Sequence, residues 1–234
     1  MSAAARLADL ASRYDLDEAA VRALAALLEA VADDPEAPTT IRVPAEAVDG
    51  HVADSLVALE LTPVAAAREV ADLGSGAGFP GLALAAALPA ARVHLVESSA
   101  PKCSFLERAS ARAGITNSEV VHARAEQWGD GGEACDLVTA RALGPLSVLA
   151  EYAAPLLRDQ GLLVAWKGRR DAQEETDGAY AAEQLGLEPV EIRPVYPFPA
   201  ARDRHLHVLR KVAPTPPRFP RRPGMAAKRP LRAA

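Results

Sequence analysis

The chain has 234 residues, a length that suits one medium-sized domain with a packed core. Half of the residues are hydrophobic and 4% are aromatic, which suits helices packed on a sheet and excludes disorder over most of the length. The net charge is −5, and the two cysteines, Cys103 and Cys135, form neither a disulfide framework nor a metal-ligand cluster. No metal site is therefore expected, and a reducing cytoplasm is the expected compartment.

The N-terminal residues carry Arg6 and Asp9 close together and have no long apolar core, so they do not resemble a signal peptide. No apolar run approaches the roughly 18 residues that a membrane-spanning helix needs, and no membrane span is expected.

The charge is distributed unevenly along the chain. Residues 213–234 contain six basic residues, six prolines and no acid, so residues 1–212 carry a net charge of −11. An acidic body with a basic tail indicates a polyanionic partner that binds locally and not across the whole surface. The alternative is a solvated tail that aids solubility. We treat three segments separately: a helical cap (1–62), a central domain (63–212) and a basic, proline-rich tail without a core of its own (213–234).

Three helices are expected in the cap: residues 3–13, a second from Asp17 to about Val31, and residues 45–61, which end just before Pro63. From residue 69 onward, short apolar runs alternate with helical stretches. The expected strands are 70–73, 92–96, 119–122, 136–140, 162–166, 189–196 and 204–212, and the expected helices between them are 80–88, 101–113, 145–157 and 171–185. This alternation predicts an α/β fold of about seven strands, mostly parallel, closed by an antiparallel pair.

The most informative segment follows the first strand and reads D-L-G-S-G-A-G-F from Asp72 to Phe79. Three alternating glycines, Gly74, Gly76 and Gly78, precede a helical pattern, which is typical of a turn that brings a nucleotide-like ligand close to the backbone. A dinucleotide fingerprint requires a third glycine at position 79, where this chain has Phe79. The Asp72 carboxylate would repel a pyrophosphate but suits the cationic amino-acid portion of S-adenosylmethionine. The sequence thus favours that cofactor over a dinucleotide or an unliganded turn.

Residues just past the other strands should lie at the same edge of the sheet, where open α/β sheets bind ligands. Glu97 ends the second strand, 23 residues past Gly74, where an acid can accept hydrogen bonds from ribose hydroxyls. Ala125 and Glu126 follow the third strand, where a methyl-donor fold reads the adenine. Three cations complete this edge: Arg124, Arg141 and Lys167. The alternatives are a surface ion pair between Arg124 and Glu126, and purely structural strand-end cations.

His51, Asp54 and Ser55 lie within one turn of the third expected helix. A hydrolase is rejected because a nucleophilic serine normally sits on a strained turn with its own oxyanion donors. This helix face either orders the substrate or the glycine loop, or forms a polar patch against the sheet.

These elements together resemble the bacterial small-subunit ribosomal RNA methyltransferase G family, also called glucose-inhibited division protein B. The matching segments are HVADSL (51–56), DLGSGAGFPG (72–81), ARAE (123–126), TARA (139–142), WKG (166–168), RHL (204–206), PRRPG (220–224) and KRPL (228–231). One segment departs from the family pattern: residues 33–42 are shorter and lack the tryptophan and asparagines usual there.

The resemblance implies a class I methyltransferase fold with an N-terminal helical cap, acting on 16S rRNA or the small ribosomal subunit. A monomer is expected. It implies methylation of N7 of one guanine in a decoding-region loop. Cofactor contacts are expected from Gly74, Phe79, Ala125, Glu126 and Arg141. Positions expected to face RNA are Arg124, Lys167, Arg204, Arg221, Arg222 and Lys228, and Arg141 and Lys167 are the expected catalytic residues.

Two rival functions remain at this point: a methyltransferase with another substrate, and a non-catalytic RNA-binding assembly factor with the same fold. A nicotinamide-dependent oxidoreductase is disfavoured by Phe79.

Overall fold

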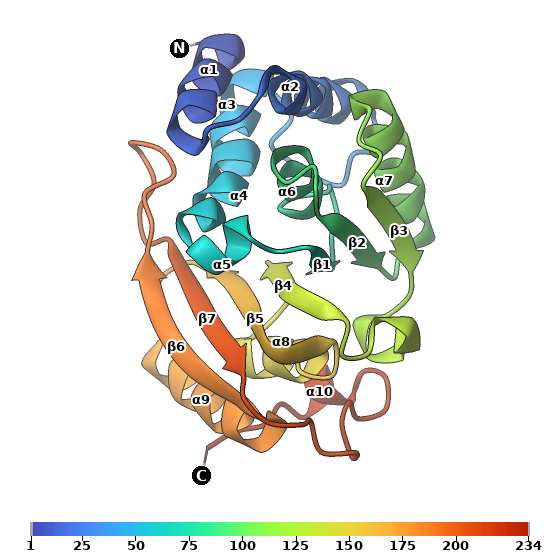
Figure 1. Cartoon of the computed structure of the whole chain (residues 1–234), viewed down its shortest axis with the longest axis vertical. Helices are drawn as coiled ribbons and strands as arrows, with labels where there is room; N and C mark the ends of the chain where they lie inside the picture. The colour runs from blue at the N-terminus through green and yellow to red at the C-terminus, as the bar shows by residue number, and fades with distance from the viewer. Residues whose placement is uncertain (1, 234) are drawn as a thin grey trace.

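The computed structural model describes residues 2–233. One seven-stranded sheet organises the chain, in the order β3-β2-β1-β4-β5-β7-β6 (Figure 1). The strands are β1 (Glu69–Leu73), β2 (Arg92–Glu97), β3 (Ser118–His122), β4 (Cys135–Arg141), β5 (Leu157–Lys167), β6 (Leu187–Pro194) and β7 (His205–Lys211). β1 to β5 pair in parallel, whereas β7 is antiparallel to both β5 and β6. The predicted α/β class and the antiparallel closing pair are confirmed.

Helices cover both faces of the sheet. The longer ones are α1 (Ala3–Tyr14), α2 (Glu18–Asp33), α6 (Gly81–Ala87), α7 (Ala100–Ala113), α8 (Leu146–Ala153) and α9 (Ala172–Leu185). α6 and α7, with the cap outside them, bury one face, and α8 and α9 bury the other (Figure 1). No helix among residues 2–233 is long and apolar enough to cross a membrane.

Local sequence explains where several helices begin and end. The side chains of Ser2 and Asp17 accept hydrogen bonds from the first turns of α1 and α2, and Asp171 does the same for α9. α7 and α9 both end at a left-handed glycine, Gly114 and Gly186.

The third predicted helix, residues 45–61, is wrong in detail. The segment is a series of short pieces: α3 (Pro44–Ala47), a π-helix η1 (Val48–Ala53), α4 (Asp54–Leu56), a 3₁₀ turn η2 (Val57–Glu60) and α5 (Thr62–Ala65). Contacts from outside the segment hold the π-helix, since Arg141 donates to the Gly50 carbonyl at 3.3 Å. π-helical turns occur frequently at functional sites.

The predicted helix 145–157 is also too long, because α8 ends at Ala153 and β5 begins at Leu157. Pro155 has no N–H to donate, so the helical hydrogen bonds cannot continue through it.

The sequence predicts a tail without a core of its own, and the structure packs the described part of the tail on the domain. Phe219 and Ala226 are buried, and a short helix α10 (Met225–Lys228) lies beside α8 (Figure 1). The tail therefore extends the core of the domain.

Candidate functional site

The glycine loop lies at the carboxyl end of β1, between neighbours β2 and β4, where the strand order reverses. Ligands of open α/β sheets bind at this point. Gly74, Gly76 and Gly78 have φ values of 68°, 55° and 87°, which side chains with a Cβ rarely adopt. The Gly74 N–H donates to the Val96 carbonyl at 2.8 Å, which fixes the loop against β2.

The buried carboxylate of Asp72 stabilises this loop. Asp72 is 1% exposed, and its carboxylate accepts from the Gly81 N–H at 3.1 Å and from Thr139 Oγ1 at 2.8 Å. Burial raises the pKa of Asp72 to about 6, against the opposing effect of these hydrogen bonds. The structure thus gives the predicted cofactor ligand a different position: Asp72 ties the start of α6 to β1 and β4 and does not line the cavity above the loop.

That cavity, which we name the glycine-loop cavity, has a volume of about 280 Å³. Its lining residues are Gly74, Val96, Glu97, Ser98, Lys102, Ala123, Arg124, Ala125, Glu126, Ala142, Leu143 and Tyr152. Five predicted site residues from three strand ends therefore meet here: Gly74, Glu97, Arg124, Ala125 and Glu126. The volume is near the lower end of the range for small-molecule sites, about 300 Å³ upward.

Glu97 is held rigidly at the edge of this cavity. Its Oε1 accepts from the Ser98 and Ser99 N–H groups at 2.8 and 2.9 Å, and Oε2 accepts from the Gly76 N–H at 3.2 Å. Since each carboxylate oxygen has two lone pairs, Glu97 keeps acceptor capacity for a hydroxyl donor.

Glu126 has a partner that the sequence did not indicate. Its Oε1 accepts from the Gly224 N–H of the tail at 2.8 Å. No ion pair joins Glu126 to Arg124 within residues 2–233, so that alternative is absent from the structure.

A second cavity of about 230 Å³, the arginine cavity, lies beside the first. It is lined by Arg141, Ala142, Trp166, Lys167, Gly168, Val195, Arg204 and His205. The predicted residues Arg141, Lys167 and Arg204 thus meet in one place. Ala142 lines both cavities, and it has a φ of 56°, a strained conformation for alanine.

Arg141 is oriented by the helix segment that carries Asp54. Its guanidinium lies 2.9 Å from Asp54 Oδ2, and Asp54 is 2% exposed. The other oxygen, Oδ1, has no hydrogen-bond partner among the described residues, and Arg204 Nε lies 3.8 Å from it. The Trp166 indole N–H donates to the Asp54 carbonyl at 2.7 Å and connects this segment to β5.

His51 connects the π-helix to the glycine loop. Its ring stacks on the buried ring of Phe79, with centroids 4.7 Å apart and an interplanar angle of 10°. Arg141 donates to Nδ1 at 3.4 Å, so Nε2 carries the proton and donates to the Ile41 carbonyl at 3.1 Å. Burial and then the Arg141 charge lower the pKa of His51 to about 4, which keeps the ring neutral.

The unusual segment 33–42 also belongs to this network. Thr39 Oγ1 lies 3.0 Å from His51 Nε2, and Arg108 binds Asp34 and Glu36. Segment 33–42 therefore supports the π-helix, whose His51 contacts Arg141. It does so without the tryptophan and asparagines that are usual there in the family that the chain resembles.

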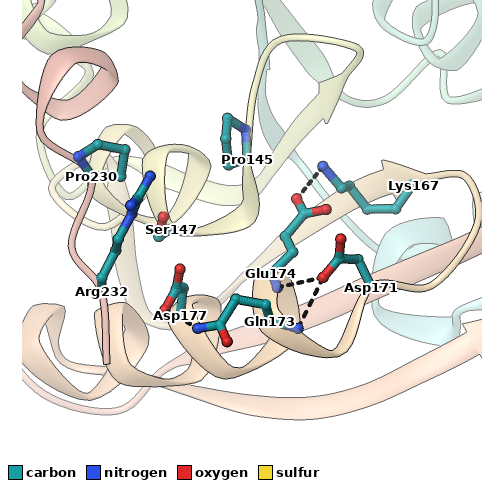
Figure 2. Close-up of a pocket in the computed structure, with 9 residues that line it drawn as sticks. All are labelled: Pro145, Ser147, Lys167, Asp171, Gln173, Glu174, Asp177, Pro230 and Arg232. Carbon is teal, nitrogen blue, oxygen red and sulfur yellow. Dashed lines mark hydrogen bonds and ion pairs between the residues drawn. The ribbon is translucent and has the colours of Figure 1, made fainter. Parts of the chain in front are cut away.

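A third cavity of about 340 Å³ lies between α8, α9 and the tail (Figure 2). Lys167 borders both this cavity and the arginine cavity. The Lys167 ammonium pairs with Glu174 at 2.5 Å, as Figure 2 shows. It also donates to the Gly144 carbonyl at 3.0 Å. Glu174 in turn accepts from the Leu146 N–H at the start of α8.

The tail residues expected to face RNA separate into two groups. Arg222 and Lys228 are exposed, as expected for phosphate contacts. Arg221 is partly buried: its guanidinium forms a bidentate pair with Glu151, which is 1% exposed, and its RNA contact stays a prediction. The sequence could not indicate Glu151 as the partner, because it lies on α8, 70 positions away in the chain.

Comparison with known proteins identifies the family. Residues 36–200 match the profile of rRNA small subunit methyltransferase G. Two curated relatives named ribosomal RNA small subunit methyltransferase G, from Chloroflexus aggregans and Rubrobacter xylanophilus, are 41% and 43% identical. The alignments cover 82% and 78% of this chain and 82% and 72% of the relatives.

A similar solved structure is cofactor-bound Rv0187 from MTB, with a TM-score of 0.56, 23% identity, and coverage of 82% of this chain and 90% of that one. At this identity the likeness concerns the fold alone, and it agrees with the class I methyltransferase architecture. The sequence match over more than half of the chain carries the assignment: the chain belongs to the rRNA small subunit methyltransferase G family.

Proposed function

We propose that this protein transfers a methyl group from S-adenosylmethionine to N7 of one guanine in a decoding-region loop of 16S rRNA. The observation that carries the proposal is the position of Ala142, which lines both the glycine-loop cavity and the arginine cavity. A methyl donor in the first cavity and a target base in the second would meet there.

The residues of the glycine-loop cavity fit the cofactor. Gly74 has a backbone conformation that allows close approach, Glu97 retains acceptor capacity for ribose hydroxyls, and Glu126 offers a carboxylate to an adenine amino group. When bound, S-adenosylmethionine supplies an electrophilic methyl group. Asp72 contributes indirectly in this proposal, by holding the loop that contacts the cofactor.

The arginine cavity suits positioning of a nucleotide. Arg204 provides positive charge for phosphate, and Arg141 and Lys167, which are paired with Asp54 and Glu174, add N–H donors for the base. Guanine N7 carries a free lone pair, so its attack on a methyl group requires no general base, and catalysis rests on orientation and electrostatics. His51 is neutral and stacked on Phe79, which suits a positioning role.

The RNA partner follows from the same chemistry. The deep, narrow major groove of paired RNA hides N7, so the target guanine should be an unstacked loop base. Exposed Arg222 and Lys228 would add phosphate contacts at the tail. In this proposal the enzyme acts as a monomer in the cytoplasm, where rRNA is transcribed and assembled.

The test is transfer of labelled methyl from S-adenosylmethionine to 16S rRNA, or to small subunits, from cells that lack the modification. Label recovered as 7-methylguanosine at one site supports the proposal. If the protein binds the cofactor but labels a different RNA or another molecule, the proposed substrate is wrong. If it does not bind the cofactor, the alternative of a non-catalytic RNA-binding assembly factor is favoured.

A further inference from the structure

An ion pair between Arg221 and Glu151 anchors the tail to the domain. Arg221 donates from its Nε and terminal nitrogen to the two Glu151 oxygens at 2.5–3.1 Å, and its backbone N–H donates to Oε1 at 3.1 Å. Glu151 lies on α8 and is 1% exposed, so it would be a costly unpaired charge without Arg221. Phe219 and Ala226, on either side of Arg221 in the chain, bury their apolar side chains. We name residues 219–226 the strap.

The strap reaches the glycine-loop cavity at a turn. Gly224 has a φ of 79°, a left-handed conformation that glycine adopts without strain. At this turn the Gly224 N–H donates to Glu126 Oε1 at 2.8 Å, and Glu126 lines the glycine-loop cavity. The strap therefore connects the ion pair on α8 to the residue that is predicted to read the adenine.

Glu126 depends on this contact for its orientation. It lies in a single 3₁₀ turn, η3 (Ala125–Gln127), which has no side-chain cap. Within residues 2–233 the Glu126 carboxylate accepts no hydrogen bond other than the one from Gly224, so Oε2 keeps its acceptor capacity. Ala125 and Trp128 of the same segment pack against the apolar cluster that contains Phe219.

We propose that the strap is part of the cofactor site: Arg221 and Gly224 are positioning residues that hold Glu126 for the adenine end of the cofactor. The inference rests on the proposed function for the identity of the cofactor. It divides the basic tail into two roles, because Arg221 then serves cofactor binding while its exposed neighbour Arg222 serves RNA.

The adjacent arginines provide a matched pair for the test. S-adenosylmethionine is titrated calorimetrically into the wild type, Arg221→Met and Arg222→Met. We expect Kd to rise about tenfold in Arg221→Met, the effect of one misplaced charge-assisted hydrogen bond, and to stay within about twofold in Arg222→Met. Wild-type affinity in Arg221→Met would overturn the inference while leaving the proposed function intact. A wild type that does not bind the cofactor overturns both.

A double-mutant cycle separates positioning from general damage. In a Glu126→Ala background, Arg221→Met should change Kd less than about twofold, because the side chain that the strap positions is already gone. An equal loss in both backgrounds would show that Arg221 acts through the fold alone and would overturn the inference. Arg221→Lys keeps a cation beside Glu151 and replaces Arg221→Met in the cycle if thermal melting shows the latter to be unfolded.

Discussion

Arg141 and Asp54 form a buried ion pair, 2.9 Å long, between the end of β4 and the helix that follows the π-helix. Asp54 is 2% exposed, so Arg141 neutralises a charge that water does not reach. The pair has two consequences: it aims the guanidinium into the arginine cavity, and it makes the fold depend on the same residue that the proposed function places beside the target base.

Arg141→Ala should therefore lower both stability and activity. We expect a loss of about 3 kcal/mol in the free energy of unfolding, because Asp54 is left buried and unpaired. In the double variant Arg141→Ala/Asp54→Asn, the charge is gone and most of the stability should return, while methyl transfer stays at least about 100-fold below the wild type. Urea unfolding and methyl transfer to 16S rRNA measure the two effects. Recovery of activity in the double variant would show that Arg141 serves the fold only.

The strands and the glycine loop were predictable because their signals are local. Short apolar runs give β1 to β5, and the alternating glycines mark the turn after β1. The site that joins them depends on contacts between distant residues. Arg141 and Asp54 are 87 positions apart, and the contacts of the π-helix with Arg141 and Ile41 outweigh the helical spacing that predicted one continuous helix.

The tail illustrates the same limit. Its composition predicts a basic, solvated segment, and Arg222 and Lys228 fit that description. Arg221 differs from Arg222 only through Glu151, a residue whose burial no pattern along the chain reveals. Asp72 is similar: its place before the glycines predicts a ligand, and its burial makes it a support for the loop.

Asp72 should give the fold a defined pH dependence. Its folded pKa is about 6, above the value of 3.8 for the unfolded chain. The raised pKa disfavours the folded state when Asp72 is ionised, so the penalty is full above pH 6 and disappears as the pH falls to about 4. Asp72→Asn keeps an acceptor for the Gly81 N–H. Its amide nitrogen can donate to Thr139 Oγ1, which reverses the bond that Asp72 accepts in the wild type. It should gain about 3 kcal/mol relative to the wild type at about pH 7 and little at about pH 4. Urea unfolding at both pH values measures this, and a pH-independent difference would contradict it.

His51 should give the stability a pH dependence of the opposite sign to that of Asp72. Its pKa falls from 6.5 in the unfolded chain to about 4 in the fold. The unfolded state therefore binds a proton first as the pH falls, and the wild type loses stability between pH 6.5 and about 4. His51→Phe keeps a ring beside Phe79 but cannot titrate. As the pH falls through that window, the wild type should lose about 3 kcal/mol of unfolding free energy relative to His51→Phe. Parallel pH profiles of the two proteins would exclude this role for His51.

The exposed tail cations should control the salt dependence of RNA binding. Arg222 and Lys228 are exposed, so each can release counterions when it meets a phosphate. Arg222→Ala and Lys228→Ala should each lower the slope of log affinity against log salt by about 1, and the double variant by about 2. Filter binding of 16S rRNA between about 50 and 200 mM salt, the range over which such slopes are read, measures this. Asp130→Ala, which removes an exposed acid, is the charge-change control and should not lower the slope. An unchanged slope in the double variant would place the RNA elsewhere on the protein and leave the tail with the strap as its one role.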